Sequence, residues 1–161
     1  MKRYVRNKMI FRGEPETLRA LRDRIAKSAG DEAISLAGII PAGEDEEERK
    51  ALWGTESEAE ETDVILYHDD TILEYSFDTL MDPPEPVFRK LAAEVPEIRM
   101  TVNWAYEDIN PDSRCGIFES EAGSGELTAV EPDDLFEFAC DVWDRDPDEE
   151  RMELEINYME E

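Results

Sequence analysis

The chain has 161 residues and a formal net charge of -26, with 43 acidic against 17 basic side chains. A negative field of this size repels nucleic acid and anionic membranes, and it attracts positively charged proteins. A hydrophobic content of 40% can build a folded core, and no apolar run approaches the roughly 20 residues of a membrane span. We therefore expect a soluble, cytoplasmic protein whose partner is basic, with no direct nucleic-acid or membrane binding.

The charge is unevenly distributed. Residues 1–27 hold nine of the 17 Lys and Arg residues and only three acids. Some of these cations fall on a predicted helix, whose basic face we expect to pair with the protein's own carboxylates. The chain is interpreted as one domain over residues 1–130, with an acidic insertion near 44–63, followed by an acidic extension over 131–161 that packs on the same domain.

The first elements follow from glycine, proline and apolar spacing. Residues 7–13 read as a strand ended by glycine, and Leu18, Leu21 and Ile25 then recur at helical spacing within residues 16–29. Residues 33–40 form an apolar stretch that is strand-like at its end. Residues 44–63 are rich in Glu and poor in large apolar side chains, so they are predicted to be a loop or mobile insertion.

The second half of the chain repeats the pattern. Alternating residues predict a hairpin of strands over 64–67 and 72–77, and a helix follows with Val87, Leu91 and Val95 on one face. Further strands are predicted over 100–106, 115–119 and 127–130. The extension is predicted to contain a helix over 132–143 and an alternating strand over 152–158.

The order strand, helix, strand, strand, helix, strand is that of a split β-α-β unit. The fold class expected from the sequence is therefore α+β: a ferredoxin-like antiparallel sheet with two helices on one face, plus an acidic C-terminal helix-strand extension.

Several short motifs resemble the YubB-like ferredoxin-like domain family. They are the strand Asn7 to Gly13, Ile39-Ile-Pro41, Trp53-Gly-Thr55, Thr79 to Pro84, Tyr106-Glu107 and Cys115-Gly116, in family order. The chain departs from the family at Glu56 and Ser57, where Lys and Trp are usual, and at Met81, where Trp is typical. The resemblance implies the ferredoxin-like fold and a plasmid or phage setting, but it implies no activity.

Catalytic and cofactor motifs are weak in this sequence. His68 is the single histidine, and beside Asp69 and Asp70 it is interpreted as a turn residue and not as a catalytic base. The spacing Asp144-x-Asp146-x-Asp148 lacks the glycine and final glutamate of a calcium loop. Cys115 and Cys140 are interpreted as ordinary buried thiols. We expect no catalytic residue, no metal and no cofactor.

Three hypotheses explain the acidity. The first is a non-enzymatic inhibitor that mimics nucleic acid and occupies the basic channel of a defence protein such as a CRISPR effector or a restriction enzyme. The second is a mobile-element protein of unknown role with a solubility or halophilic coat, and the third is an enzyme with carboxylates gathered in one concave pocket. The first is preferred, with these predicted partner-binding residues: Glu44, Asp45, Glu46, Glu47, Glu48, Glu58, Glu60, Glu61, Asp144, Asp146, Asp148, Glu149 and Glu150.

Overall fold

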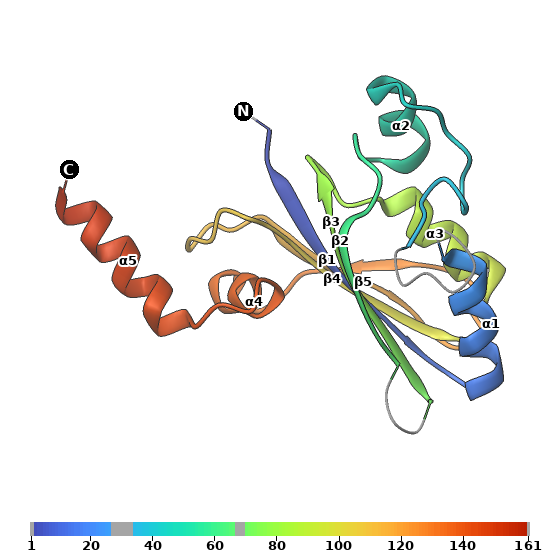
Figure 1. Ribbon diagram of the computed structural model, residues 1–161. Helices are drawn as coiled ribbons and strands as arrows, with labels where there is room; N and C mark the ends of the chain where they lie inside the picture. The colour runs from blue at the N-terminus through green and yellow to red at the C-terminus, as the bar shows by residue number, and fades with distance from the viewer. Residues whose placement is uncertain (1, 27–33, 67–69, 161) are drawn as a thin grey trace.

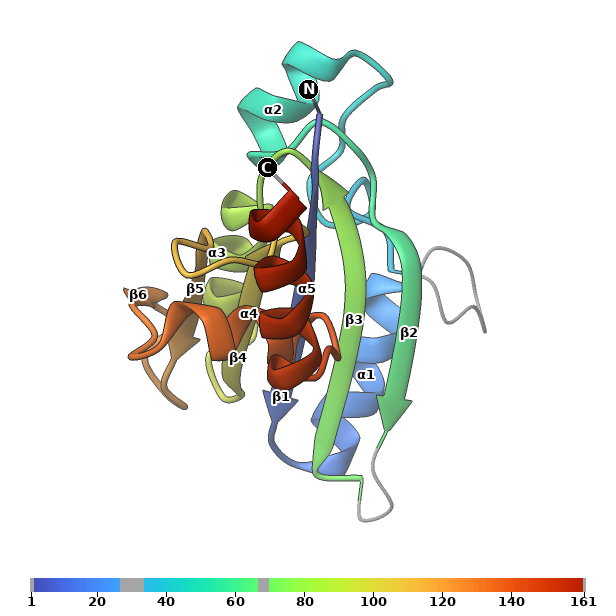
Figure 2. The ribbon, with the colours of Figure 1, turned by 90° about the vertical axis from the view of Figure 1, so that its left-hand side faces the viewer.

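The computed structural model describes residues 2–26, 34–66 and 70–160, and these form an α+β protein built on a six-stranded antiparallel sheet (Figures 1 and 2). The strands are β1 (Tyr4–Arg12), β2 (Glu60–Leu66), β3 (Ile72–Leu80), β4 (Arg99–Tyr106), β5 (Cys115–Ser120) and β6 (Thr128–Val130). Their order across the sheet is β2-β3-β1-β4-β5-β6. The first strand of the chain is therefore central, with β3 on one side and β4 on the other.

The helices lie on both sides of this sheet. They are α1 (Pro15–Ile25), α2 (Glu46–Trp53), α3 (Glu85–Glu94), α4 (Leu135–Val142) and α5 (Pro147–Glu160). Figure 1 shows α1, α2 and α3 on one side, which we call the inner side, and α4 and α5 on the other, which we call the outer side. The predicted α+β class with an antiparallel sheet is confirmed.

The alternation of β1 explains this two-sided burial. Val5, Met9 and Phe11 are buried on the inner side, whereas Tyr4 and Arg6 lie on the outer side and are more exposed. Met9 and Phe11 belong to one apolar core together with residues of three helices. These are Leu18 and Leu21 of α1, Trp53 of α2, and Val87, Phe88 and Leu91 of α3. Burial of this large apolar surface is the main stabilising contribution to the fold.

Helix α4 covers part of the outer side. Its Ala139 and Val142 are buried against Ala105 of β4. Trp143, at the end of the helix, donates its indole N–H to the Ala105 carbonyl at 3.0 Å. Lys8 of β1 donates to the Asp141 carbonyl at 2.9 Å. These bonds fix the end of α4 over the central strands, and they position the chain that continues into α5.

The acidic insertion is ordered, which corrects the loop predicted over 44–63. Residues 46–53 form α2, and residues 60–66 form the edge strand β2. The Asp45 carboxylate accepts a hydrogen bond from the Glu48 N–H at 3.2 Å and caps the helix, which ends at the left-handed Gly54. Residues 34–40, predicted to be strand-like at their end, form turns instead, while Ala33 lies outside the described residues.

The C-terminal strand predicted over 152–158 is wrong, because these residues belong to α5. Alternation of Met152, Leu154 and Ile156 imitated a strand, but Pro147 in the first turn and the acids that follow it favour a helix. Figure 1 shows α5 projecting away from the sheet. The helix predicted over 132–143 is confirmed as α4, and the first helix ends at Ile25, so part of the predicted range to 29 lies outside the described residues.

Three of the motif segments quoted for the family resemblance, those with Asn7, Thr79 to Pro84 and Tyr106, contribute to one buried polar network. Asn7, fully buried, donates its amide to Thr79 Oγ1 at 3.1 Å, and the Thr79 hydroxyl donates to the Asp82 carbonyl at 2.8 Å. The Tyr106 hydroxyl donates to the Asp82 carboxylate at 3.1 Å. This network ties β1, β4 and the segment before α3 together, so these residues have a structural role.

Candidate functional site

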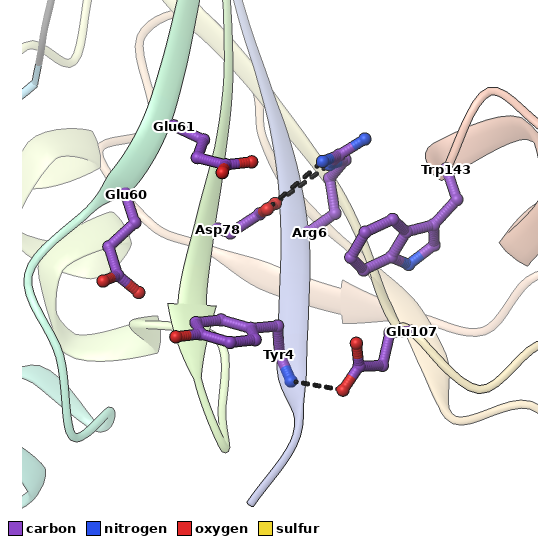
Figure 3. Close-up of a pocket in the computed structure, with 7 residues that line it drawn as sticks. All are labelled: Tyr4, Arg6, Glu60, Glu61, Asp78, Glu107 and Trp143. Atoms are coloured by element: carbon purple, nitrogen blue, oxygen red, sulfur yellow. Dashed lines mark hydrogen bonds and ion pairs between the residues drawn. The ribbon is translucent and has the colours of Figure 1, made fainter.

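A hollow of about 260 Å³ opens on the outer side of the sheet, beside the end of α4 (Figure 3). Its lining residues come from five parts of the chain: Tyr4, Arg6, Glu60, Glu61, Asp78, Glu107 and Trp143. Four of these seven side chains are carboxylates and one is a cation. The hollow is therefore strongly acidic, and two aromatic rings form part of its wall.

A second hollow of about 280 Å³ adjoins the first, since Glu107 and Trp143 line both. It continues toward α5, which contributes Glu150 and Glu153, and Ile109 and Arg145 complete its lining. Arg145 lies 3.7 Å from Glu150, so its charge is already opposed by a carboxylate of the same hollow. We call the two hollows together the acidic groove.

The cation of the first hollow is fully engaged within the protein. The Arg6 guanidinium donates to both carboxylate oxygens of Asp78, with distances of 2.9 Å and 3.1 Å. It also lies 4.2 Å from the centre of the Trp143 ring. Hydrogen bonding to Asp78 raises the pKa of Arg6, because the carboxylate stabilises the charged form. Arg6 is thus part of the wall and does not neutralise the remaining acids.

The register of the sheet brings these residues together. Glu60 of β2 lies opposite Asp78 of β3, and Asp78 lies opposite Arg6 of β1. The pairing of β2 shifts between Glu60 and Asp63, and Glu61 adopts a positive φ of 50°. This irregularity is a β-bulge at the sheet edge, and with it two successive carboxylates line the same hollow.

Tyr4 lies beside these carboxylates. Its backbone N–H donates to Glu107 at 3.2 Å, which holds the start of β1 against the β4–β5 connection. The negative charge of Glu60 raises the pKa of the Tyr4 hydroxyl, so the phenol stays protonated. Glu60, Glu61 and Glu107 have no cationic ion-pair partner among the described residues.

The predicted partner-binding residues are distributed over three places. Glu60, Glu61 and Glu150 line the acidic groove. Residues 44–48 lie at the exposed start of α2, where Asp45 caps the helix, Glu46 lies 3.0 Å from the Lys2 ammonium, and Glu48 accepts from the Gly43 N–H at 3.1 Å. Glu44 and Glu47 are exposed in the same segment.

The remaining predicted residues largely serve the chain itself. Glu58 accepts hydrogen bonds from the backbone N–H groups of Leu36 and Ala37, so it fixes the turns before α2. Asp144 pairs with Lys8 at 2.7 Å, and Asp146 accepts from the Asp148 N–H at 2.8 Å at the start of α5. Asp148 lies 3.6 Å from Arg151, and Glu149 is exposed.

Sequence analysis did not identify eight of the groove residues: Tyr4, Arg6, Asp78, Glu107, Ile109, Trp143, Arg145 and Glu153. The alternation of β1 did contain a signal, because it places Tyr4 and Arg6 on one side of a strand. Which residues surround Tyr4 and Arg6 depends on the register of β1 with β3 and on the position of α4, and no local sequence pattern specifies either.

Metal and nucleophile chemistry receive no support from the described residues. Within residues 2–26, 34–66 and 70–160, no three His, Cys, Asp or Glu side chains are placed to hold a metal ion. His68 and Asp69 lie outside the described residues. Cys140 is buried and Cys115 half-buried, and burial raises the pKa of the Cys115 thiol to about 11. Among the residues that the structure describes, no helix is long and apolar enough to cross a membrane.

Comparisons of the chain with protein-family models, with curated proteins and with solved structures found no match.

Proposed function

We propose that the protein is a non-enzymatic inhibitor that binds a basic nucleic-acid-binding protein and competes with its nucleic acid. The observation that carries this proposal is the acidic groove. Its carboxylates come from β2, β3, the β4–β5 connection and α5, while both of its cations, Arg6 and Arg145, face a carboxylate of the same groove. A concave surface with this charge complements the positive side chains that line nucleic-acid channels.

The proposal extends to the fold family and its setting. The strand order β2-β3-β1-β4 is the order expected for a ferredoxin-like split β-α-β unit, and β5 and β6 extend it at one edge. The motif resemblance to the YubB-like family suggests a plasmid or phage protein. A host defence protein, such as a CRISPR effector or a restriction enzyme, is accordingly the proposed target.

Two carboxylates of the groove, Asp78 and Glu107, are held by contacts that favour a structural role over a catalytic one. A general acid or base must be free to exchange a proton with its substrate. Asp78 is held by two hydrogen bonds from Arg6, and Glu107 accepts a backbone hydrogen bond from Tyr4. Both groups therefore support the wall of the groove.

Equilibrium competition tests the proposal. A purified CRISPR effector or restriction enzyme from the host would be incubated with labelled duplex DNA, and this protein would be added up to a large excess. Displacement of the DNA at low salt, weakening as salt is raised, is the expected result. Retention of the DNA at every protein concentration, for each such effector of the host, would overturn the proposal.

Raising the salt also separates the mimic from a halophilic coat. A coat stabilises the folded chain toward molar salt but gives no competition with DNA at any salt concentration.

A further inference from the structure

We infer that the first hollow of the acidic groove receives the guanidinium of an arginine side chain from the partner. This inference rests on the proposed function and specifies the chemistry by which the groove recognises its partner. The hollow of about 260 Å³ is several times the roughly 30 Å³ that one water occupies, so a side chain can enter it.

The charges of the hollow call for a cation. Glu60, Glu61 and Glu107 lack cationic partners among the described residues, while Asp78 is already matched by Arg6. The backbone places the three acids on different sides of the hollow, since two come from the β2 bulge and one from the β4–β5 connection. An entering cation can therefore be opposed by carboxylates from two directions, which suits a planar, multiply donating group.

The wall of the hollow already holds one cation of the protein itself, and that cation is a guanidinium. The Trp143 ring already lies 4.2 Å from the Arg6 guanidinium, whose nitrogen atoms donate to Asp78. The protein thus holds one guanidinium by an aromatic face and a carboxylate at the edge of the same hollow (Figure 3). The same combination occurs a second time in the hollow, because the Tyr4 ring lies beside the carboxylates of Glu60 and Glu107.

Other occupants fit less well. A metal ion is disfavoured because no three acids among the described residues are placed as ligands. An anion would face uncompensated carboxylates, and a second copy of this chain would bring another net charge of -26. Lysine offers the same charge as arginine, but its ammonium is more strongly hydrated and cannot stack as a plane.

Nuclear magnetic resonance with a small probe can test whether the first hollow binds a guanidinium. N-acetyl-arginine amide has one positive charge and no carboxylate, and the indole N–H signal of Trp143, held by the Ala105 carbonyl, reports on the hollow. We expect a saturable shift of this signal, and weaker binding of N-acetyl-lysine amide. The paired change Glu60→Gln and Glu61→Gln should weaken the arginine probe by about fivefold.

The matched control is the pair Glu44→Gln and Glu47→Gln, which removes the same charge from the exposed start of α2. It should bind the probe like the unmodified protein, and the amide spectrum verifies that both variants are folded. Absence of a saturable Trp143 shift, or equal weakening by both variants, would overturn the inference. Competition with DNA for an effector, without any probe binding, would refute this inference alone, whereas probe binding without competition would refute only the proposed function.

Discussion

Arg6 and Asp78 form a doubly hydrogen-bonded ion pair across neighbouring strands, with distances of 2.9 Å and 3.1 Å. The two residues lie directly opposite each other in β1 and β3, and Asp78 is only 7% exposed. The pair closes one side of the first hollow and leaves the other carboxylates without cations. The shape of the groove therefore depends on the Arg6–Asp78 ion pair.

Replacing Arg6 with Gln should destabilise the protein by about 2 kcal/mol, because Asp78 would remain charged and nearly buried without its cation. Urea unfolding measures the loss. The double variant with Asp78→Asn should recover part of it, since the unpaired charge is then gone. Additive losses in the double variant would contradict the pairing. Glu46→Gln, at the exposed pair with Lys2, is the control and should leave the urea midpoint nearly unchanged.

Trp143→Ala should cost about 3 kcal/mol, because it removes the ring from the outer apolar cluster together with its hydrogen bond to the Ala105 carbonyl. Trp143→Phe keeps an aromatic face for Arg6 and should lose less, about 1 kcal/mol for the missing N–H donor. Thermal unfolding followed by circular dichroism compares the two variants. Equal losses would show that the ring itself contributes little.

Two glycines offer a matched test of how α2 is attached. Gly54 and Gly123 both have positive φ, at 80° and 93°. A Cβ at Gly54 would lie 2.7 Å from Pro86 Cδ, whereas a Cβ at Gly123 would meet nothing within 4 Å. Gly123→Ala should cost about 1 kcal/mol from backbone strain, and Gly54→Ala about 2 to 3 kcal/mol because a clash is added. Similar chemical denaturation midpoints would contradict this packing of α2 against α3.

Cys115 should react slowly with iodoacetamide. Burial raises its thiol pKa from 9.0 to about 11, so the reactive thiolate is about a hundredfold scarcer at pH 8 than for a free thiol. The protonated thiol contributes stability that is complete below pH 9, the unfolded pKa, and is lost as the pH rises through about 11. Labelling of a Cys140→Ala variant at pH 8 and pH 10, with a urea-unfolded reference, measures the reactivity, and urea unfolding of the same variant at pH 8 and above pH 11 measures the change in stability. Equal rates in the folded and unfolded states at pH 8 would contradict the burial.

The sequence predicted the sheet better than the acidic segments, for a physical reason. Strands and helices that bury one side leave a local pattern in the sequence. This pattern is the alternation over 72–77 and 100–106, and the helical spacing around Leu18 and Leu91. Helix α2 depends on its caps, Asp45 and Gly54, and on a single buried Trp53, so a periodicity search passes over it.

The groove could be predicted only in part. Glu60, Glu61 and Glu150 stood out because they lie in acidic runs. Arg6, Asp78 and Trp143 come from three distant segments, and only the strand register and the docking of α4 make them neighbours. A local pattern does not contain such long-range pairing.

The measurement that tests the central claim most directly is affinity capture from host lysate, with elution by duplex DNA and identification by mass spectrometry. The bait is compared with a triple Gln variant at Glu60, Glu61 and Glu107, and with a matched triple Gln variant at Glu44, Glu47 and Glu149, which are exposed outside the groove. We predict that the bait and the matched variant retain a basic nucleic-acid-binding protein that DNA releases, and that the groove variant loses it. Equal capture by both variants, or a captured protein that DNA does not release, would contradict the account.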